Sequence, residues 1–441
     1  MNTEKPYYHS VTLDKDKCVG CTNCLKRCPT EAIRVHGGRA HIIDERCIDC
    51  GECIRVCAYH AKVATTDPLA AINRFPYKIA LPAPALYGQF KSLPHVGSVT
   101  RALHQMGFDE VYDVARGADI VSRAVQERLR RPDCPRPLIS SSCPAVVRLI
   151  QTRFPELIDN IVDVKSPMEM AAIQARREFC LKHNADPSDV GCFFITPCAA
   201  KVTAIRKPLG HARSAVDGAI SFLEVYGLMA GLIKKGGVPS PGEDAGFRAT
   251  ALGVGWARTG GEATAAGIEN ALAVDGIESV AKVLEEIENN RLSGLTFFEG
   301  LACVGGCVGG PLVFENVFIA RNRIRELLFR LPKLRPEENI SDGEMAQIAE
   351  QVGLETQIEQ VKTLQLDADL QTALEKMDLI EEIRQRLPGL DCGSCGSPSC
   401  QALAEDIVGG WANETDCLFV LKQRVRDMAK QMVELSDSTR R

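Results

Sequence analysis

Short apolar runs alternate with amphipathic helical patterns through the middle of the chain. The apolar runs predict buried strands, and apolar residues that recur every three or four positions predict helices. The predicted strands are residues 78–86, 137–144, 190–198 and 248–255, and the predicted helices are residues 99–108, 168–183, 221–235 and 277–290. Strands that alternate with helices favour an α/β fold with a largely parallel sheet.

The two ends of the chain carry different patterns. Residues 35–43 alternate around a Gly-Gly pair, which predicts a hairpin. Residues 331–387 are charged and helical in pattern, so we interpret them as linker helices. Beyond Cys417, apolar residues recur at heptad spacing, at Leu418, Leu421, Val425, Met428, Met432 and Leu435. This segment predicts either a helix that packs on its own domain or one that pairs with itself or with a signalling partner.

Composition and charge argue against several classes of function. Hydrophobic residues make up 45% of the chain and charged residues 25%, which is typical of a globular protein. The net charge of −5 is spread without a basic block, so no nucleic-acid partner is expected. The longest apolar stretch, residues 218–233, contains Glu224 and is too short to span a membrane. The first ten residues lack the pattern of a secretory signal, which predicts a cytoplasmic location.

Cysteine is the unusual feature, since the chain contains 19. In a reducing compartment, metal or redox chemistry explains them better than disulfides do. Residues 18–28 and 47–57 each hold four cysteines spaced by two, two and three residues, and the second run repeats the first after 29 residues. Three thiolates on a tight loop reach one 4Fe–4S cluster, and the fourth ligates the neighbouring cluster.

This spacing assigns the eight N-terminal cysteines to two 4Fe–4S clusters. One set is Cys18, Cys21, Cys24 and Cys57, and the other is Cys47, Cys50, Cys53 and Cys28. Two zinc sites are the alternative, but zinc ribbons use Cys-x-x-Cys pairs instead of two runs of four cysteines. Residues 8–66 resemble a bacterial two-cluster ferredoxin.

Four further cysteines lie near the C-terminus, at Cys392, Cys395, Cys400 and Cys417. Glycines 393 and 396 allow the backbone to wrap closely around a bound group. The local sequence resembles the small 4Fe–4S domain of some corrinoid-protein and ion-pumping electron-transfer subunits. We therefore expect a third 4Fe–4S cluster here, with zinc as the rival metal.

Isolated cysteines in the middle of the chain lie where predicted strands end. They are Cys143, Cys198, Cys303 and Cys307, and each of the three segments that hold them contains proline or glycine near the cysteine. Ligands collect at strand ends in α/β sheets, and helix N-termini and glycine-rich backbone offer N–H donors to an anion. A lone cysteine is more often a buried small apolar residue, which is how we interpret Cys134, Cys180 and Cys192.

Taken together, these central motifs resemble the catalytic domain of iron-iron (FeFe) hydrogenases. The family's segment Thr-Ser-Cys-Cys-Pro is similar to residues 140–144, and its Pro-Cys-x-x-Lys matches Pro197, Cys198 and Lys201. Its Glu-x-x-x-Cys-x-x-x-Cys-x-x-Gly-Gly matches Glu299, Cys303, Cys307, Gly309 and Gly310. The resemblance covers residues 77–330 and implies the α/β fold of that family.

The resemblance also implies a cofactor. Cys143, Cys198, Cys303 and Cys307 would hold a 4Fe–4S cluster, linked through Cys307 to a two-iron unit with CO, CN and a bridging dithiolate. This is the H-cluster, at which hydrogen is split into protons and electrons. Lys201 would donate to a cyanide, and the Pro197 segment and the amides of Gly305 and Gly306 would help to hold the unit. The implied partners are H₂, protons, and ferredoxin or another redox protein.

Several positions depart from the family. The cysteine that relays protons in its catalytic members is Ser142 here, and loss of a positioned relay costs about 10²–10⁴-fold in rate. A family glutamate is Ala204, the acidic helix is unmatched at Val125 and Arg128 with only Glu127 nearby, and the third segment ends Gly-Gly-Pro-Leu. The pattern therefore predicts a slow hydrogenase that resembles the sensory branch of the family, in which a signalling module often follows; this chain stops where that module would begin.

Three other functions remain open from the sequence. The chain could be a working hydrogenase linked to ferredoxin, with a proton route through Ser142 and water. It could instead be a non-catalytic electron relay that never receives the two-iron unit, or, less in keeping with the spacings, a zinc protein. The expected organisation is a two-cluster domain (residues 1–70), an H-cluster domain (71–330), linker helices (331–387), a small mainly helical 4Fe–4S domain (388–418) and a heptad-patterned helix (419–441).

Overall fold

The structure is a computed structural model that describes residues 8–91, 93–236, 248–361 and 366–438. The chain forms two compact units, which are described separately. The first contains residues 1–11, 48–51 and 64–360, and the second contains residues 12–47, 52–63 and 361–441. The prediction that the chain lacks a secretory signal rests largely on residues 1–7, which lie outside the described part.

The first unit is built on two parallel sheets. The larger has the order β6-β5-β8-β9, formed by β5 (Tyr77–Pro82), β6 (Glu110–Val111), β8 (Val190–Thr196) and β9 (Gly218–Ser221). The smaller has the order β10-β11-β7, formed by β7 (Leu138–Ile139), β10 (Ala271–Asp275) and β11 (Phe297–Leu301). Strand pairing is parallel throughout both sheets, which confirms the predicted α/β class.

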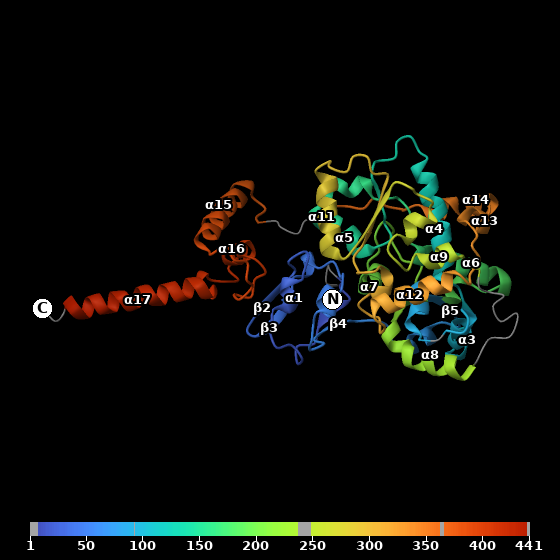
Figure 1. Cartoon of the computed structure of the whole chain (residues 1–441), viewed down its shortest axis with the longest axis horizontal. Helices are drawn as coiled ribbons and strands as arrows, with labels where there is room; N and C mark the ends of the chain where they lie inside the picture. Colours follow the sequence, from blue (N-terminus) through green and yellow to red (C-terminus); the bar gives the residue numbers. More distant parts are fainter. Residues whose placement is uncertain (1–7, 92, 237–247, 362–365, 439–441) are drawn as a thin grey trace. The chain divides into compact units, whose positions relative to one another are not determined.

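Helices surround these sheets (Figure 1). They include α3 (Gly97–Gln105), α4 (Val114–Leu129), α5 (Pro144–Arg153), α6 (Pro167–His183), α7 (Ala199–Arg206), α8 (Phe222–Gly236), α10 (Gly261–Ala265), α11 (Ile277–Glu288) and α12 (Val317–Leu328). The four predicted helices are confirmed as α3, α6, α8 and α11. Strand β8 is wholly buried, as a central parallel strand covered on both faces must be.

One predicted strand is wrong. Residues 248–255 contain helix α9 (Ala251–Gly255), and no strand is assigned there. The Thr250 hydroxyl accepts a hydrogen bond from the backbone N–H of Gly253 at 3.0 Å, which is an N-cap that favours the helix. Small residues on a short segment carry too little periodicity to separate a buried strand from a buried helix.

Residues 331–352 pack against the α/β core. Helices α13 (Pro336–Asn339) and α14 (Asp342–Val352) follow α12, and Met345, Ile348 and Val352 join a core that includes Val121 and Val125 of α4. The buried Arg123 side chain donates to the backbone carbonyl of Ile340 at 3.0 Å. The first part of the expected linker therefore belongs to the α/β unit.

The second unit joins the N-terminal cysteine region to the C-terminal segment. The predicted hairpin is present as β2 (Ile33–His36) and β3 (Arg39–Ile42), and β1 (Val11–Leu13) pairs with β4 (Lys62–Ala64). Short helices α1 (Asn23–Lys26) and α2 (Glu52–Arg55) carry cysteines, and α15 (Leu370–Arg386), α16 (Cys400–Val408) and α17 (Leu418–Ser438) form the C-terminal part.

A buried ion pair links the two parts of the second unit. The Arg34 Nε lies 2.5 Å from a carboxylate oxygen of Asp406, and both residues are buried. The N–H of Val35 also donates to the carbonyl of Gly396 at 2.8 Å. A Cβ at Gly396 would lie only 1.9 Å from the Val35 carbonyl oxygen, so this approach requires glycine.

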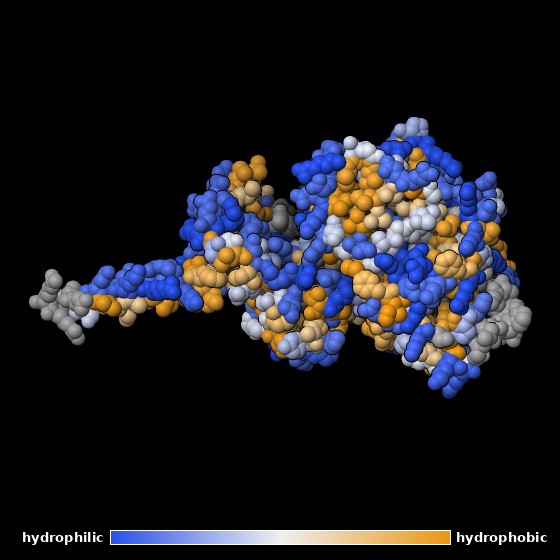
Figure 2. Space-filling view, viewed as in Figure 1, coloured by the Kyte–Doolittle hydropathy of each residue, from blue (hydrophilic) through white to orange (hydrophobic). Residues whose placement is uncertain are grey.

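Helix α17 is a single helix on which most of the apolar residues are exposed, although Val420 packs against the small C-terminal core. Met428, Met432 and Leu435 are each more than 60% exposed. In Figure 2 the helix shows a hydrophobic edge beside a hydrophilic one. Within the described residues, no helix has both the length and the apolar character needed to span a bilayer.

Candidate metal centres

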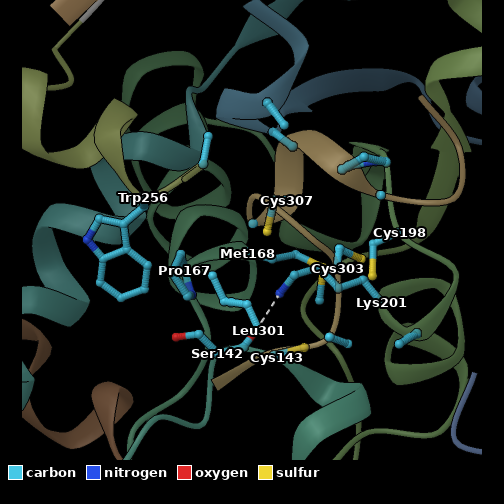
Figure 3. Close-up of a pocket in the computed structure, with 18 of the residues that line it drawn as sticks. Ser142, Cys143, Pro167, Met168, Cys198, Lys201, Trp256, Leu301, Cys303 and Cys307 are labelled. Carbon is cyan, nitrogen blue, oxygen red and sulfur yellow. Dashed lines mark hydrogen bonds between the residues drawn. The ribbon is translucent and has the colours of Figure 1, made fainter. Parts of the chain in front are cut away.

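Three segments that are far apart in sequence meet at one pocket in the α/β unit. Cys143 precedes α5, Cys198 precedes α7, and Cys303 and Cys307 lie in the loop after β11. All four cysteines line this pocket, together with Lys201 (Figure 3). The structure thus brings together the four thiols that the central motifs single out.

Local sequence explains why the first two cysteines point into the pocket. Cys143 and Cys198 have extended backbone at the N-cap positions of α5 and α7, and Pro144 occupies the first turn of α5. The N–H groups at the start of a helix have no partner within the helix and carry a partial positive charge. Two helix N-termini therefore favour an anionic group in the pocket.

The third segment is a tight glycine loop. Gly306 has φ of +91°, and a Cβ there would lie 2.8 Å from the backbone carbon of Arg258. The N–H of Val308 donates to the carbonyl of Ala257 at 3.1 Å, and the N–H of Leu312 donates to the carbonyl of Pro197 at 3.1 Å. The first bond ties the Cys303–Cys307 loop to the segment after α9, and the second ties the residues that follow this loop to the segment that carries Cys198.

The charges of the pocket suit thiolates bound to a cation. Burial raises the pKa of the Cys198 thiol, and Cys303 and Cys143 raise it further. Burial likewise raises the pKa of Cys307 to about 12, while the positive charge of Lys201 acts in the opposite direction. Metal cations that replace the thiol protons favour the thiolate form of such ligands. The donor set therefore fits an iron–sulfur cluster.

Lys201 is positioned by the first cysteine segment. Its Nζ donates to the backbone carbonyl of Ser142 at 3.1 Å, drawn as a dashed line in Figure 3. Ser142 itself lines the pocket, as do Gly306 and Pro197. Gly305 is absent from the described lining, and a Cβ there would lie 2.5 Å from the Val317 side chain. Its role is thus to allow the tight turn.

The remaining central cysteines lie elsewhere. Cys192 is fully buried within β8, and Cys180 packs against the same core. Cys134 is half-buried beside another core. Among the described residues, none of these three lines the pocket, which agrees with their interpretation as ordinary apolar residues.

A buried carboxyl pair in the pocket wall was not predicted. Glu262 and Glu299 are 2% and 1% exposed, and both line the pocket. Glu299 accepts from the N–H groups of Gly260 at 2.9 Å and Ala263 at 3.0 Å, and the Ser140 hydroxyl donates to Glu262 at 2.5 Å. The only sequence signal for a buried Glu262 is its position in the stretch GGEATAAG, where the neighbouring residues are small.

Burial raises the pKa of Glu262, and the neighbouring negative charge of Glu299 raises it further. The Ser140 and Ser142 hydroxyls oppose this rise. Burial also raises the pKa of Glu299, against the backbone N–H groups that hold its charged form. The pair can therefore keep a proton near neutral pH, beside Ser142 in the pocket wall.

Val125 and Arg128, the two positions of α4 at which carboxylates were expected from the family, are not acidic. Val125 is fully buried in the core, and Ala204, a separate departure on α7, is also buried. Arg128 pairs with Asp163 at 2.6 Å, and Glu127 is exposed on α4. Glu262 and Glu299 therefore lie on other segments than the positions at which the sequence departs from the family.

The first N-terminal cysteine set lines a separate pocket in the second unit. Cys18, Cys21, Cys24 and Cys57 all contribute to its wall. The N–H of Ala40 lies 3.4 Å from Cys18 Sγ, and the N–H of Ala61 lies 3.3 Å from Cys57 Sγ. This arrangement suits a cluster whose sulfur ligands accept backbone hydrogen bonds.

The second N-terminal set is divided between the units. Cys28, Cys47 and Cys53 belong to the second unit, whereas Cys50 belongs to the α/β unit and lines the pocket of the central cysteines. The N–H of Ala32 donates to Cys28 Sγ at 3.2 Å. The role of these four residues as one ligand set stays a prediction.

The C-terminal cysteines lie close together around α16. Burial raises the pKa of Cys395, and Cys417 and Cys392 raise it further. Cys400 opens α16, and the buried Cys417 immediately precedes α17. The neighbouring core is small and contains Ile380, Ile383 and Leu403, so a bound metal group would add stability that this core alone does not provide.

Comparison with known proteins agrees with this geometry. Residues 77–270 and 262–311 match the family described as iron only hydrogenase large subunit, C-terminal domain. Residues 10–58 match a 4Fe-4S dicluster domain, and residues 387–419 match a family described as an Fe-S cluster.

Individual relatives and solved structures give the same result. The periplasmic Fe hydrogenase large subunit of Nitratidesulfovibrio vulgaris is 29% identical, over 73% of this chain and 90% of its own length. Iron hydrogenase 1 of Clostridium pasteurianum is 26% identical, over 77% and 72%. A solved FeFe-hydrogenase, studied for oxygen inactivation of its H cluster, has a TM-score of 0.51 at 18% identity and covers 67% of this chain and 96% of its own. At 18% identity, the similarity to this solved structure shows a shared fold alone.

Proposed function

This chain belongs to the iron-only hydrogenase large-subunit family, and from that premise we propose that its central pocket activates hydrogen. The protein is a hydrogenase-like iron–sulfur oxidoreductase. The observation that carries the proposal is the convergence of Cys143, Cys198, Cys303 and Cys307 on one pocket with Lys201 among them. When bound there, the H-cluster supplies the metal site at which H₂ is exchanged for two protons and two electrons.

Each residue has a distinct part in the proposal. The four cysteines would hold the 4Fe–4S part of the H-cluster, and Cys307 would also be a ligand of its two-iron unit. Lys201 lies against the Ser142 carbonyl and offers its remaining N–H groups to an anionic cyanide. The N–H of Gly306 donates to the carbonyl of Cys303 at 3.0 Å, so the loop around Gly305 and Gly306 would contribute through its tight shape. The two helix N-termini would stabilise the negative charge of the cofactor.

The proton path is where this chain differs from fast enzymes. Ser142 stands in place of the relay cysteine, and a hydroxyl is a much weaker acid than a thiol. Glu262 and Glu299 are buried in the same wall with raised pKa values, which suits them to hold and release a proton near neutrality. We propose that protons pass through Ser142 and this pair more slowly than through a thiol relay.

Electrons are proposed to leave through three further 4Fe–4S clusters. Two are held by the N-terminal cysteines and one by Cys392, Cys395, Cys400 and Cys417. The external acceptor or donor is ferredoxin or another redox protein. The cytoplasmic location expected from the sequence stays a prediction, since one relative is periplasmic by name.

A sensory role would follow from the slow proton transfer proposed above, combined with the exposed helix α17. A slow site is a poor metabolic catalyst, but its redox state still reports the presence of hydrogen. Helix α17 offers an apolar edge through which that state could reach a partner or a second copy of the chain. A working ferredoxin-linked hydrogenase is the second candidate, favoured by the intact carboxyl pair.

Infrared spectroscopy of the matured protein tests the proposal most directly. Bands of iron-bound CO and CN are expected, and Lys201→Met should shift the CN bands while Lys165→Met, a buried lysine outside the pocket, should not. Clean iron–sulfur spectra without such bands would leave a non-catalytic electron relay as the function.

A further inference from the structure

The two halves of the N-terminal cysteine region repeat in backbone as well as in sequence. Positive φ angles recur 29 residues apart, at Gly20 and Asp49, at Thr22 and Gly51, and at Glu31 and His60. The hydrogen bonds to the fourth cysteine of each run also match. Ala32 N–H to Cys28 Sγ measures 3.2 Å, and Ala61 N–H to Cys57 Sγ measures 3.3 Å. The halves thus offer two similar settings for two clusters.

One pair of equivalent positions differs sharply in chemistry. Ile33 follows Ala32, whereas Lys62 follows Ala61. Both side chains are buried, and each residue is 2% exposed. The same place in the repeat therefore holds a neutral apolar group in one half and a cation in the other.

The Lys62 ammonium has no protein acceptor. Its Nζ is buried and makes no hydrogen bond within the part of the chain that the structure describes. Removing an ammonium from water without a partner is strongly unfavourable. A buried cation at this place indicates that an anion lies beside it in the loaded protein.

The pocket of the first cysteine set supplies the place for that anion. Lys62 lines it together with Cys18, Cys21, Cys24 and Cys57. Burial raises the pKa of Cys24, and the charge of Lys62 is the largest influence in the opposite direction. A 4Fe–4S cluster with four thiolates carries a charge of −2 when oxidised and −3 when it has gained one electron, so a fixed cation favours the reduced form.

We infer that Lys62 is an electrostatic partner of the cluster held by Cys18, Cys21, Cys24 and Cys57, and raises its reduction potential above that of its twin beside Ile33. The inference rests on the proposed cluster ligands. The higher potential determines where electrons go. Electrons released from hydrogen collect preferentially at this cluster, each reducing one 4Fe–4S centre by one electron. Lys62 thus influences which cluster holds the electron and takes no part in the cleavage of the hydrogen molecule.

The test is a redox titration of the reconstituted full-length protein, with dithionite as reductant and paramagnetic resonance as readout. Lys62→Met should lower one ferredoxin-type midpoint so that its reduction equilibrium weakens at least tenfold, which is about 59 mV for one electron. Lys15→Met removes the same charge from an exposed position in the same unit and should leave all midpoints unchanged. Ile33→Lys should raise the midpoint of the other cluster.

Iron content separates the outcomes. Lys62→Met with a full iron complement and unmoved midpoints would overturn the inference. If Lys62→Met loses iron, then Lys62→Arg should retain both the iron and the potential, and equal loss in the two variants would show a purely steric role. Absence of two ferredoxin-type clusters from the wild-type protein would instead refute the proposed ligand sets, so the two failures are distinguishable.

Discussion

The N-terminal cysteine region and the pocket of the α/β unit both gather thiols, but over very different lengths of chain. Eight cysteines lie between residues 18 and 57, and their spacing places them on short loops. The four pocket cysteines lie between residues 143 and 307 and meet only because two parallel sheets bring their strand ends together. The first region is specified by local spacing, and the second by the packing of the whole unit.

This difference has consequences for the thiols. Burial raises the pKa of Cys198 and Cys307 strongly, because they lie deep in a packed core. Cys21 is exposed. The four pocket thiols are therefore less exposed than Cys21. Lower exposure would suit the proposed hydrogen chemistry, and higher exposure would suit electron exchange with a partner.

The largest expected effect comes from removing one pocket ligand. Cys303→Ser should reduce hydrogen turnover below roughly one hundredth of wild type, because the remaining thiols cannot hold the cluster. Cys57→Ser should spare the CO and CN infrared bands, since that cysteine lies in a separate pocket. Cys180→Ser is the control and should change neither activity nor spectra. Retained bands and activity in Cys303→Ser would contradict the shared site.

Part of this comparison could be predicted from residues alone. The cysteine runs predict the N-terminal ligand sets because spacing on a short loop limits which sulfurs can meet. The structure brings the first set together at one pocket, and the second set stays a prediction. Helices α6 and α11 were predicted because each has a long, regular pattern. The pocket was predicted through resemblance to a family, since no local signal connects Cys143 with Cys307.

Other features depend on tertiary contacts that the sequence does not show. Helix α9 was taken for a strand because its small residues pack in either form. Glu262 looks like a surface carboxyl, and only the fold buries it beside Glu299. Residues 342–352 look like a linker helix, yet Met345 and Ile348 enter the core against α4. Lys62 was visible in the repeat, but its burial was not.

A carboxyl variant tests the proton side of the pocket. Glu262→Gln keeps the shape of the side chain and removes its proton, so turnover should fall by about 10²-fold. The infrared bands should keep their intensity, because the ligands remain. Glu127→Gln alters an exposed glutamate on α4 and should have no effect. Full activity in Glu262→Gln would exclude the carboxyl pair from the route.

A variant that is expected to gain activity tests the role of Ser142 in proton transfer. Ser142→Cys restores a thiol beside the Lys201 contact and should raise turnover at least about tenfold, since a thiol relays protons near neutral pH. The rate should be normalised to the infrared intensity of the cofactor. Ser141→Cys, one residue earlier, serves as the matched control. An unchanged rate in fully matured Ser142→Cys would show that the serine is not the slow step.

The pH profile should reveal the buried pair through a smaller change. The raised pKa of Glu262 keeps it protonated above the ordinary value of about 4.3, and it loses the proton as pH rises through the raised pKa. The charged groups that act on it are Glu299 and Lys201. Hydrogen evolution should therefore decline on the alkaline side by up to about tenfold per pH unit, more steeply than in Glu262→Gln. Parallel profiles for the two proteins would count against this assignment.

The smallest effect on turnover is expected at the C-terminal cysteines. Among the described residues, none of these four cysteines lines the pocket of the α/β unit. Because proton transfer is expected to limit the rate, slower electron transfer elsewhere should not lower it. Cys400→Ser should therefore lose the iron of one cluster yet keep turnover within about twofold of wild type.

The C-terminal result also distinguishes the two candidate roles. Arg34→Met breaks the buried pair with Asp406 without touching a cysteine, so it serves as a control for loss of packing alone. Iron analysis should show that Arg34→Met retains the metal that Cys400→Ser loses. A large loss of turnover in Cys400→Ser alone would place this cluster on the main electron route and favour a metabolic hydrogenase, whereas unchanged turnover leaves the C-terminal segment available for signalling through α17.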